Sequence, residues 1–184
     1  MQGCPDMKYA AFFRNVNLGR PNCPTKVQLE AAFAGAGAES AASFLTNGTV
    51  VFAVAAGSEP HDVLAAAHLT LQAECGLREP AYIRAVEYLA GLVALDPFAS
   101  IERSSVHECC VSFLPQGIAL PAVPLESRRG DVEVFRGTGT EAWSLSRKVG
   151  NTPGSPNAFL EKLLGQPVTT RAWNTVVRLV GRHA

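Results

Sequence analysis

Polar side chains that can bind a small ligand follow apolar segments at three places in this sequence. The guanidinium group of arginine can bind a carboxylate or a phosphate through two hydrogen bonds. Asparagine amides and the backbone N–H groups of a glycine-containing loop can surround the same kind of group. If the three places meet in the fold, they form a site for a small polar or anionic ligand. The candidate ligand-binding residues are Arg14, Asn15, Asn17, Asn47, Arg171, Asn174 and Thr175.

The same residues also have structural roles that need no ligand. Asparagine at the end of a strand commonly hydrogen-bonds to loop backbone. Asn174 or Thr175 can cap the helix expected at the end of the chain. The sequence leaves both interpretations open.

Familiar catalytic patterns are absent. The sequence has no Gly-x-Ser-x-Gly nucleophile turn, no P-loop and no His-Glu-x-x-His zinc helix. An enzyme would have to take its acid or base from isolated residues, and the candidates are His107, Glu141 and Cys109. Such a residue should lie in a pocket and have a perturbed pKa. An enzyme with one of these groups is the first alternative to a binding protein.

The cysteines favour a reducing compartment over a disulfide framework or a metal site. There are five of them, an odd number, and no Cys-x-x-Cys pair. His107 and Cys109 share one face of an expected strand, but nothing nearby supplies the two further ligands that zinc needs. We therefore expect no metal and no cofactor.

Charge and hydropathy limit the partners. The chain has 16 Lys and Arg against 16 Asp and Glu, so it lacks the basic surface of a duplex-DNA binder. No apolar run approaches the roughly 20 residues of a membrane helix, and residues 1–6 lack a signal-peptide pattern. We expect a cytoplasmic protein without a membrane partner. Contact with single-stranded nucleic acid across a sheet face is a second alternative, and the sequence makes no prediction of oligomeric state.

The predicted strands and helices follow the same order in both halves of the chain: strand, helix, strand, strand, helix, strand. An Asn-Gly pair at 47–48 marks the first hairpin, and Thr25 can cap the first helix. Pro121 and Pro124 make the crossover helix of the second half short or irregular. The predicted ranges are 8–16, 26–34, 41–45, 49–54, 58–75 and 81–85, then 108–114, 116–126, 131–136, 141–147, 155–164 and 166–171, with further helices at 86–95 and 173–182.

This order predicts an α+β fold made of two ferredoxin-like (βαββαβ) halves with antiparallel sheets, plus a C-terminal helix. The two halves would represent an ancient structural duplication, an inference that rests on element order alone. The predicted parts are a flexible leader at 1–6, a first half at 7–86, a helical connector at 87–105, and a second half with the C-terminal helix at 106–184.

Several segments resemble a bacterial family called domain of unknown function 1697. The similar segments are 9–14, 17–19, 47–52, 96–98, 158–165 and 169–176, and the resemblance runs from Met7 to about Leu179. It implies two ferredoxin-like subdomains and no established activity. The chain departs from the family's pattern in its first loop, which lacks the usual lysines, and at 151–153, where relatives often have a basic run. Together the patterns predict a small cytoplasmic bacterial binding protein with a polar or anion-binding loop site.

Overall fold

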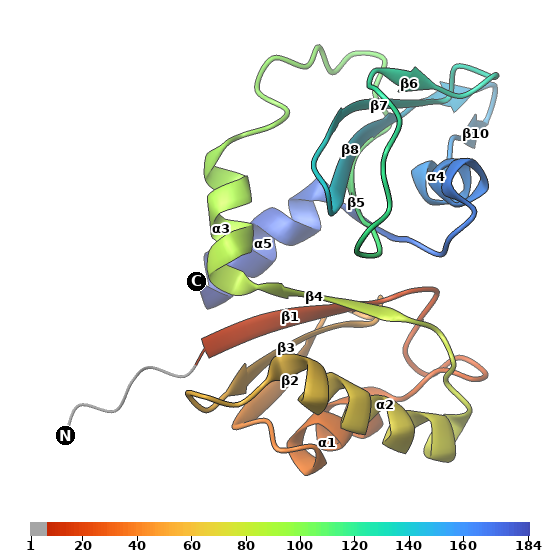
Figure 1. Cartoon of the computed structure of the whole chain (residues 1–184). Coiled ribbons are helices and arrows are strands. Elements are labelled where there is room, and N and C mark those ends of the chain that lie inside the picture. The colour runs from red at the N-terminus through yellow and green to blue at the C-terminus, as the bar shows by residue number, and fades with distance from the viewer. Residues whose placement is uncertain (1–6) are drawn as a thin grey trace. The chain divides into compact units, whose positions relative to one another are not determined.

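Figure 1 shows a computed structural model of the chain, which describes residues 7–184. The predicted leader at 1–6 lies outside the described residues. The chain divides into two compact units, the first formed by residues up to Leu89 together with Arg182–Ala184, and the second by Ala90–Gly181. Both units contain an antiparallel sheet and helices, so the predicted α+β class with antiparallel sheets is confirmed.

The first unit consists of a four-stranded sheet with two helices on one face (Figure 1). Its strands lie in the order β2-β3-β1-β4, and every neighbouring pair is antiparallel. The central position of β1 agrees with its continuous apolar sequence. The elements are β1 (Met7–Phe13), α1 (Lys26–Gly35), β2 (Ser40–Phe44), β3 (Thr49–Val54), α2 (Pro60–Cys75) and β4 (Ala81–Ala85).

Local sequence signals fix where the two helices of this unit begin and end. Thr25 caps α1 in a capping box: its hydroxyl accepts a hydrogen bond from the backbone N–H of Gln28, and the Gln28 side chain accepts one from the N–H of Thr25. Pro60 occupies the first turn of α2, where its missing N–H costs nothing. Gly76 ends α2 in the left-handed conformation, with φ 74°.

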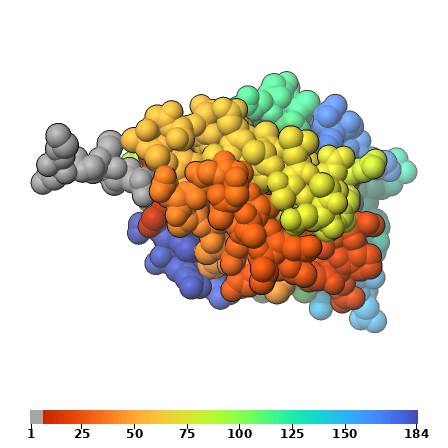
Figure 2. Space-filling model, turned by 90° about the horizontal axis from the view of Figure 1, so that it is seen from below, coloured from red at the N-terminus to blue at the C-terminus, as the bar shows by residue number. Residues whose placement is uncertain are grey.

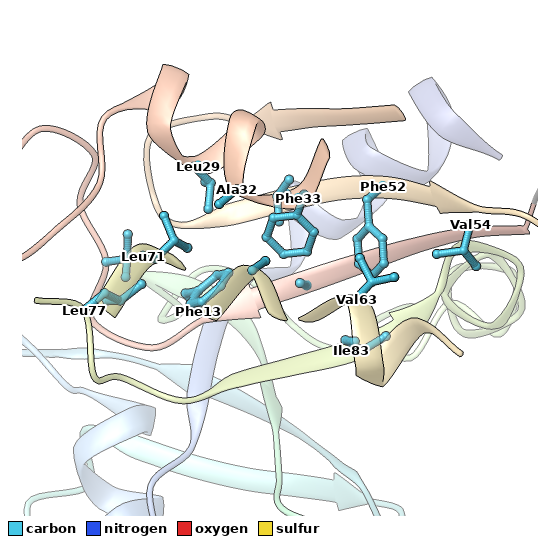
Figure 3. Packing of buried hydrophobic residues seen from close by; sticks show 14 residues of the cluster. Phe13, Leu29, Ala32, Phe33, Phe52, Val54, Val63, Leu71, Leu77 and Ile83 are labelled. Atoms are coloured by element: carbon cyan, nitrogen blue, oxygen red, sulfur yellow. The ribbon is translucent and has the colours of Figure 1, made fainter. Parts of the chain in front are cut away.

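The core of the first unit lies between the sheet and these two helices (Figure 3). Phe33 of α1 stands between Phe13 of β1 and Phe52 of β3, with ring centroids 6.3 Å and 4.9 Å away. All three rings are fully buried, and such aromatic contacts add to the stabilisation from buried area. Figure 2 shows the outer surface of α1 in orange and α2 in yellow.

The second unit is built on a five-stranded sheet in the order β11-β5-β8-β7-β6, again antiparallel at each pair. Helix α4 packs against this sheet (Figure 1). Ser155 caps α4 and Gly165 ends it at φ 65°. Residues of both units form α3 (Val86–Ala94) and α5 (Trp173–His183). The other elements of the second unit are β5 (Glu108–Phe113), β6 (Leu125–Glu126), β7 (Val132–Gly137), β8 (Glu141–Ser146), β9 (Lys148–Val149), β10 (Thr152–Pro153), α4 (Pro156–Leu164) and β11 (Thr169–Ala172).

The crossover between β5 and β7 corrects one prediction. No helix forms at 116–126, where the sequence favoured a short or irregular one; the segment is irregular and ends in the two-residue strand β6. Pro121 and Pro124 cannot donate helical hydrogen bonds and their rings obstruct the preceding turn. Leu120 instead packs against the apolar cluster that contains Leu114 and Leu160. The short pair β9 and β10 was not predicted.

The second unit also has an aromatic cluster on the side of the sheet away from α4. Trp143, Trp173 and Phe98 are buried, and the Phe98 ring lies 5.7 Å from Trp173 and 5.3 Å from Phe135. Among residues 7–184, no helix is long and apolar enough to cross a membrane.

Candidate functional site

The first predicted loop and the Asn-Gly hairpin turn are joined by backbone hydrogen bonds in the first unit. The N–H of Phe13 donates to the carbonyl of Gly48 at 2.9 Å, and that of Leu18 donates to the carbonyl of Thr46 at 3.0 Å. Gly48 has φ 71°, and a Cβ there would lie 2.6 Å from the Val16 Cβ. Only glycine fits this approach, so the turn sequence explains why the two segments meet.

The segment that leads into β4 reaches the same place. The N–H of Arg14 donates to the carbonyl of Pro80 at 2.9 Å, and the Arg14 Nη1 donates to the Glu79 Oε2 at 2.6 Å, a partly exposed ion pair. A Cβ added at Gly76 would lie 3.5 Å from the Asn22 Oδ1. Residues 14–24, 45–48 and 76–80 are called here the loop end of the first unit.

The predicted asparagines occupy this loop end in different ways. Asn15 has a left-handed backbone with φ 52°, which asparagine tolerates better than most residues, and its side chain is exposed. Asn17 is also exposed. The Asn47 Oδ1 accepts a hydrogen bond from the Thr49 hydroxyl at 2.8 Å. The structure therefore brings Arg14, Asn15, Asn17 and Asn47 into one region.

A cavity of about 400 Å³ opens at the loop end, lined by Asn22, Gly76, Arg78 and Glu79. None of these four was predicted from the sequence as a site residue. Gly76 was recognisable as the residue that ends α2, but nothing local indicates that the following Arg-Glu pair faces Asn22, more than 50 positions earlier. Arg78 is exposed, whereas Glu79 is the partner of Arg14.

The second unit contains the other predicted ligand-binding residues, Arg171, Asn174 and Thr175. They therefore do not share a unit with the four predicted residues at the loop end. Arg171 of β11 is buried, and its Nη1 donates to the Thr169 hydroxyl at 2.8 Å and to the Thr170 carbonyl at 3.0 Å. Burial lowers the pKa of this guanidinium to about 10, which still leaves it charged at neutral pH. Asn174 is exposed and Thr175 is buried, both in the first turn of α5.

Comparison with known proteins supplies a family but no activity. Residues 7–143 match the model of a family described as a protein of unknown function (DUF1697). The chain belongs to this family. The resemblance read from the sequence is thereby confirmed, although the segments at 158–165 and 169–176 lie outside the matched residues. A comparison with curated proteins finds no match.

A solved structure shares the fold of this DUF1697 protein. It is the conserved bacterial protein SP0830 from Streptococcus pneumoniae, with a TM-score of 0.63. The two chains are 14% identical, and the similarity covers 96% of this chain and 98% of the other. At that identity the likeness concerns the fold alone.

The three residues that could serve an enzyme of this DUF1697 chain lie in different surroundings. His107 is exposed just before β5. Glu141 is fully buried, and its Oε2 accepts hydrogen bonds from the hydroxyls of Thr138 and Thr140, both at 2.8 Å. Burial raises the pKa of the Cys109 thiol, which makes it a weaker nucleophile at neutral pH. None of the three lines the cavity at the loop end.

Metal-binding groups and thiols are dispersed in the described part of this family member. Among residues 7–184, no group of three or more His, Cys, Asp or Glu side chains could hold a metal ion. Cys23, Cys75, Cys109 and Cys110 are free thiols. Cys110 is buried, and burial raises its pKa, as for a small core residue rather than a reactive group.

Proposed function

We propose that this DUF1697 protein is a cytoplasmic bacterial binding protein that holds a small polar or anionic ligand at the loop end of its first unit. The observation that carries the proposal is the cavity of about 400 Å³ beside the Arg14–Glu79 ion pair. Its size lies within the roughly 300–1,000 Å³ typical of small-molecule sites.

The charges around this cavity favour an anion. Arg78 and Glu79 line it, and Arg14 approaches Glu79 within 2.6 Å. Two guanidinium groups and one carboxylate leave a net charge of +1 at neutral pH. A carboxylate or phosphate group can therefore be accommodated without leaving a buried charge unpaired, while the Asn22 amide can fix its orientation.

The backbone of the loop end supports a preformed site. Hydrogen bonds from Phe13, Leu18 and Arg14 hold the loop against the hairpin turn and the approach to β4. A site held by backbone bonds loses little conformational entropy when a ligand binds. In this proposal the rim of the site is formed by Arg14, Asn15, Asn17 and Asn47. Participation of Arg171, Asn174 and Thr175 in the same site stays a prediction.

We also propose that both units are ferredoxin-like halves of one duplication. In support, β5, β7, β8 and β11 take the same order in their sheet as β1, β2, β3 and β4 do in theirs. Both sheets are antiparallel. The irregular crossover of the second half is then an eroded counterpart of α1. The bacterial source of the structural relative and the free thiols agree with a bacterial cytoplasmic origin.

A ligand screen on the full chain tests the binding proposal. Thermal unfolding is measured with succinate, inorganic phosphate and adenosine monophosphate, each at up to 10 mM. A ligand present at 100 times its dissociation constant stabilises the native state by about 2.7 kcal/mol. Arg78→Gln should abolish the stabilisation by a ligand that binds at the loop end, because it removes the exposed cation of this cavity. Lys148→Gln, which removes an exposed cation of the second unit, should leave it unchanged.

Two results would contradict the proposal. The first is an unchanged melting temperature with every compound. The second is that Arg78→Gln weakens the stabilisation by none of the compounds that stabilise the unaltered protein. No observation favours the enzyme alternative. Phe12, Phe52 and Trp143 are buried in the sheets, so these rings cannot stack on the bases of single-stranded nucleic acid.

A further inference from the structure

A second cavity lies wholly within the second unit, between helix α4 and the turn before β7. It has a volume of about 550 Å³. One wall is the turn at 127–131, and the other is one face of α4, where the lining positions are three and four residues apart. The lining residues are Ser127, Arg128, Arg129, Asp131, Phe159, Lys162 and Leu163.

The turn that carries the two arginines is held rigidly by Ser127. The Ser127 hydroxyl accepts hydrogen bonds from the N–H groups of Asp131 and Val132 at 3.1 Å and 3.0 Å and donates to the Asp131 Oδ1 at 2.6 Å. The N–H of Gly130 closes the turn on the Ser127 carbonyl at 2.9 Å. Arg128 and Arg129 thus project from a fixed backbone, which reduces the entropy lost when they bind a ligand.

The lining of this cavity is strongly cationic. Arg129 lies 3.8 Å from Asp131, a long ion pair. Arg128 and Lys162 are exposed and have no ion pair among residues 7–184. Three cations against one carboxylate give a local charge of +2, which matches the charge of a phosphate monoester near neutral pH.

The opposite wall is apolar. Phe159 is half-buried against the core of the unit, and Leu163 is 42% exposed beside it. A free inorganic anion would leave this wall in contact with water. A ligand with an apolar or aromatic body next to its charged group would cover the wall and gain from burial of that surface.

We propose that the cavity between α4 and the turn at 127–131 binds a small phosphate monoester with an apolar or aromatic body. Arg128, Arg129 and Lys162 bind the phosphate, with the arginines able to donate paired hydrogen bonds. Phe159 and Leu163 contact the body. This site is separate from the loop end of the first unit and does not depend on the function proposed there.

Phenyl phosphate is a suitable probe, with inorganic phosphate and phenol as its two halves. Isothermal titration of the full chain, in a phosphate-free buffer of low ionic strength, should show one saturable site for phenyl phosphate. Inorganic phosphate should bind at least tenfold more weakly, and phenol should not saturate. The double variant Arg128→Gln with Lys162→Gln should weaken phenyl phosphate binding at least tenfold, whereas Lys148→Gln should not change it.

The apolar wall has its own test. Leu163→Ser should weaken phenyl phosphate binding severalfold and leave inorganic phosphate binding unchanged, because only the phenyl ring reaches the wall. Leu69→Ser, at an exposed leucine of the first unit, should affect neither. The altered side chains are exposed, so the fold should persist, which thermal unfolding checks.

Amide chemical shifts of the unaltered protein locate the probe independently of any variant. Phenyl phosphate should shift resonances of the turn at 127–131 and of the second half of α4. Lack of saturable binding, full affinity in the double variant, or shifts confined to the loop end of the first unit would each overturn the assignment. Loss of binding in Arg78→Gln alone would place the probe at the other site and would likewise overturn it.

Discussion

The sheets of the two units follow the same strand order, but their helix-covered faces are made of different side chains. In the first unit, Ala11, Phe13 and Phe52 meet two helices in an apolar core. In the second, the Ser112 hydroxyl lies 2.7 Å from that of Thr170, which donates to Asn157 of α4 at 2.9 Å. One helix is therefore positioned there partly by hydrogen bonds rather than by apolar contact alone.

The crossover from β5 to β7 contains no helix, whereas the crossover from β1 to β2 contains α1. With only α4 on its face, the second sheet has less apolar surface to cover, and hydrogen bonds specify direction where packing area is limited. The strand order is nevertheless the same in both sheets. The pairing of strands thus depends less on a particular crossover helix than on the alternation and turns of the strands themselves.

The largest effect should come from the aromatic core of the first unit. Phe33→Ala should reduce the free energy of unfolding by about 3–5 kcal/mol, because it removes a fully buried ring that contacts Phe13 and Phe52. Guanidinium chloride unfolding followed by circular dichroism measures the change. Val27→Ala on the same helix, at a side chain 75% exposed, should cost under about 0.5 kcal/mol. A cost below about 1 kcal/mol for Phe33→Ala would show that α1 adds little to this unit.

The next largest difference should be in the cost of replacing a glycine by alanine in each of the two hairpin turns. Gly48→Ala should cost about 2–4 kcal/mol, because φ is 71° and the new methyl group would overlap Val16. Gly139 holds the turn of the β7–β8 hairpin in open space, without a left-handed φ. Gly139→Ala should therefore cost under about 1 kcal/mol. Equal melting temperatures for the two variants would mean that the first hairpin is not locked against the loop end as the backbone bonds indicate.

Most elements of both units were predictable from the sequence because their signals are local. Thr25, Asn47 with Gly48, and Gly165 marked a helix start, a turn and a helix end, and each signal depends on a few neighbouring residues. The prediction for 116–126 failed because the expected element order placed a crossover helix there, which Pro121 and Pro124 prevent.

The cavities were not predictable in the same way. Arg128 and Lys162 stand 34 positions apart and meet only because α4 packs beside the turn before β7. Arg14 was singled out as a ligand-binding residue, but its ion pair with Glu79 depends on strand β4 lying next to β1. Side chains that converge through sheet pairing leave no spacing pattern in the sequence.

Substitutions at Thr49 and Glu141, the first residues of β3 and β8, should differ less in their effect on the free energy of unfolding. Glu141→Ala should cost about 2 kcal/mol, because it removes the buried carboxylate that accepts hydrogen bonds from the hydroxyls of Thr138 and Thr140. Thr49→Val, which removes the hydroxyl that donates to Asn47, should cost about 1 kcal/mol. Unfolding of the second unit can be followed by fluorescence, since both tryptophans lie in it. If Glu141→Ala left the free energy of unfolding unchanged, this carboxylate would have no structural role. The enzyme alternative would then be favoured again.

The smallest contrast is between the caps of α1 and α4. Thr25 takes part in two hydrogen bonds of a capping box, whereas Ser155 accepts one, from the N–H of Ala158. Thr25→Ala should cost about 1–2 kcal/mol and Ser155→Ala about 1 kcal/mol. Amide hydrogen exchange in the first turn of each helix measures both costs locally. Faster exchange should be confined to the helix that carries the change. If Ser155→Ala proved the more damaging, α4 would depend on its cap more strongly than α1, which packs against the neighbouring helix α2.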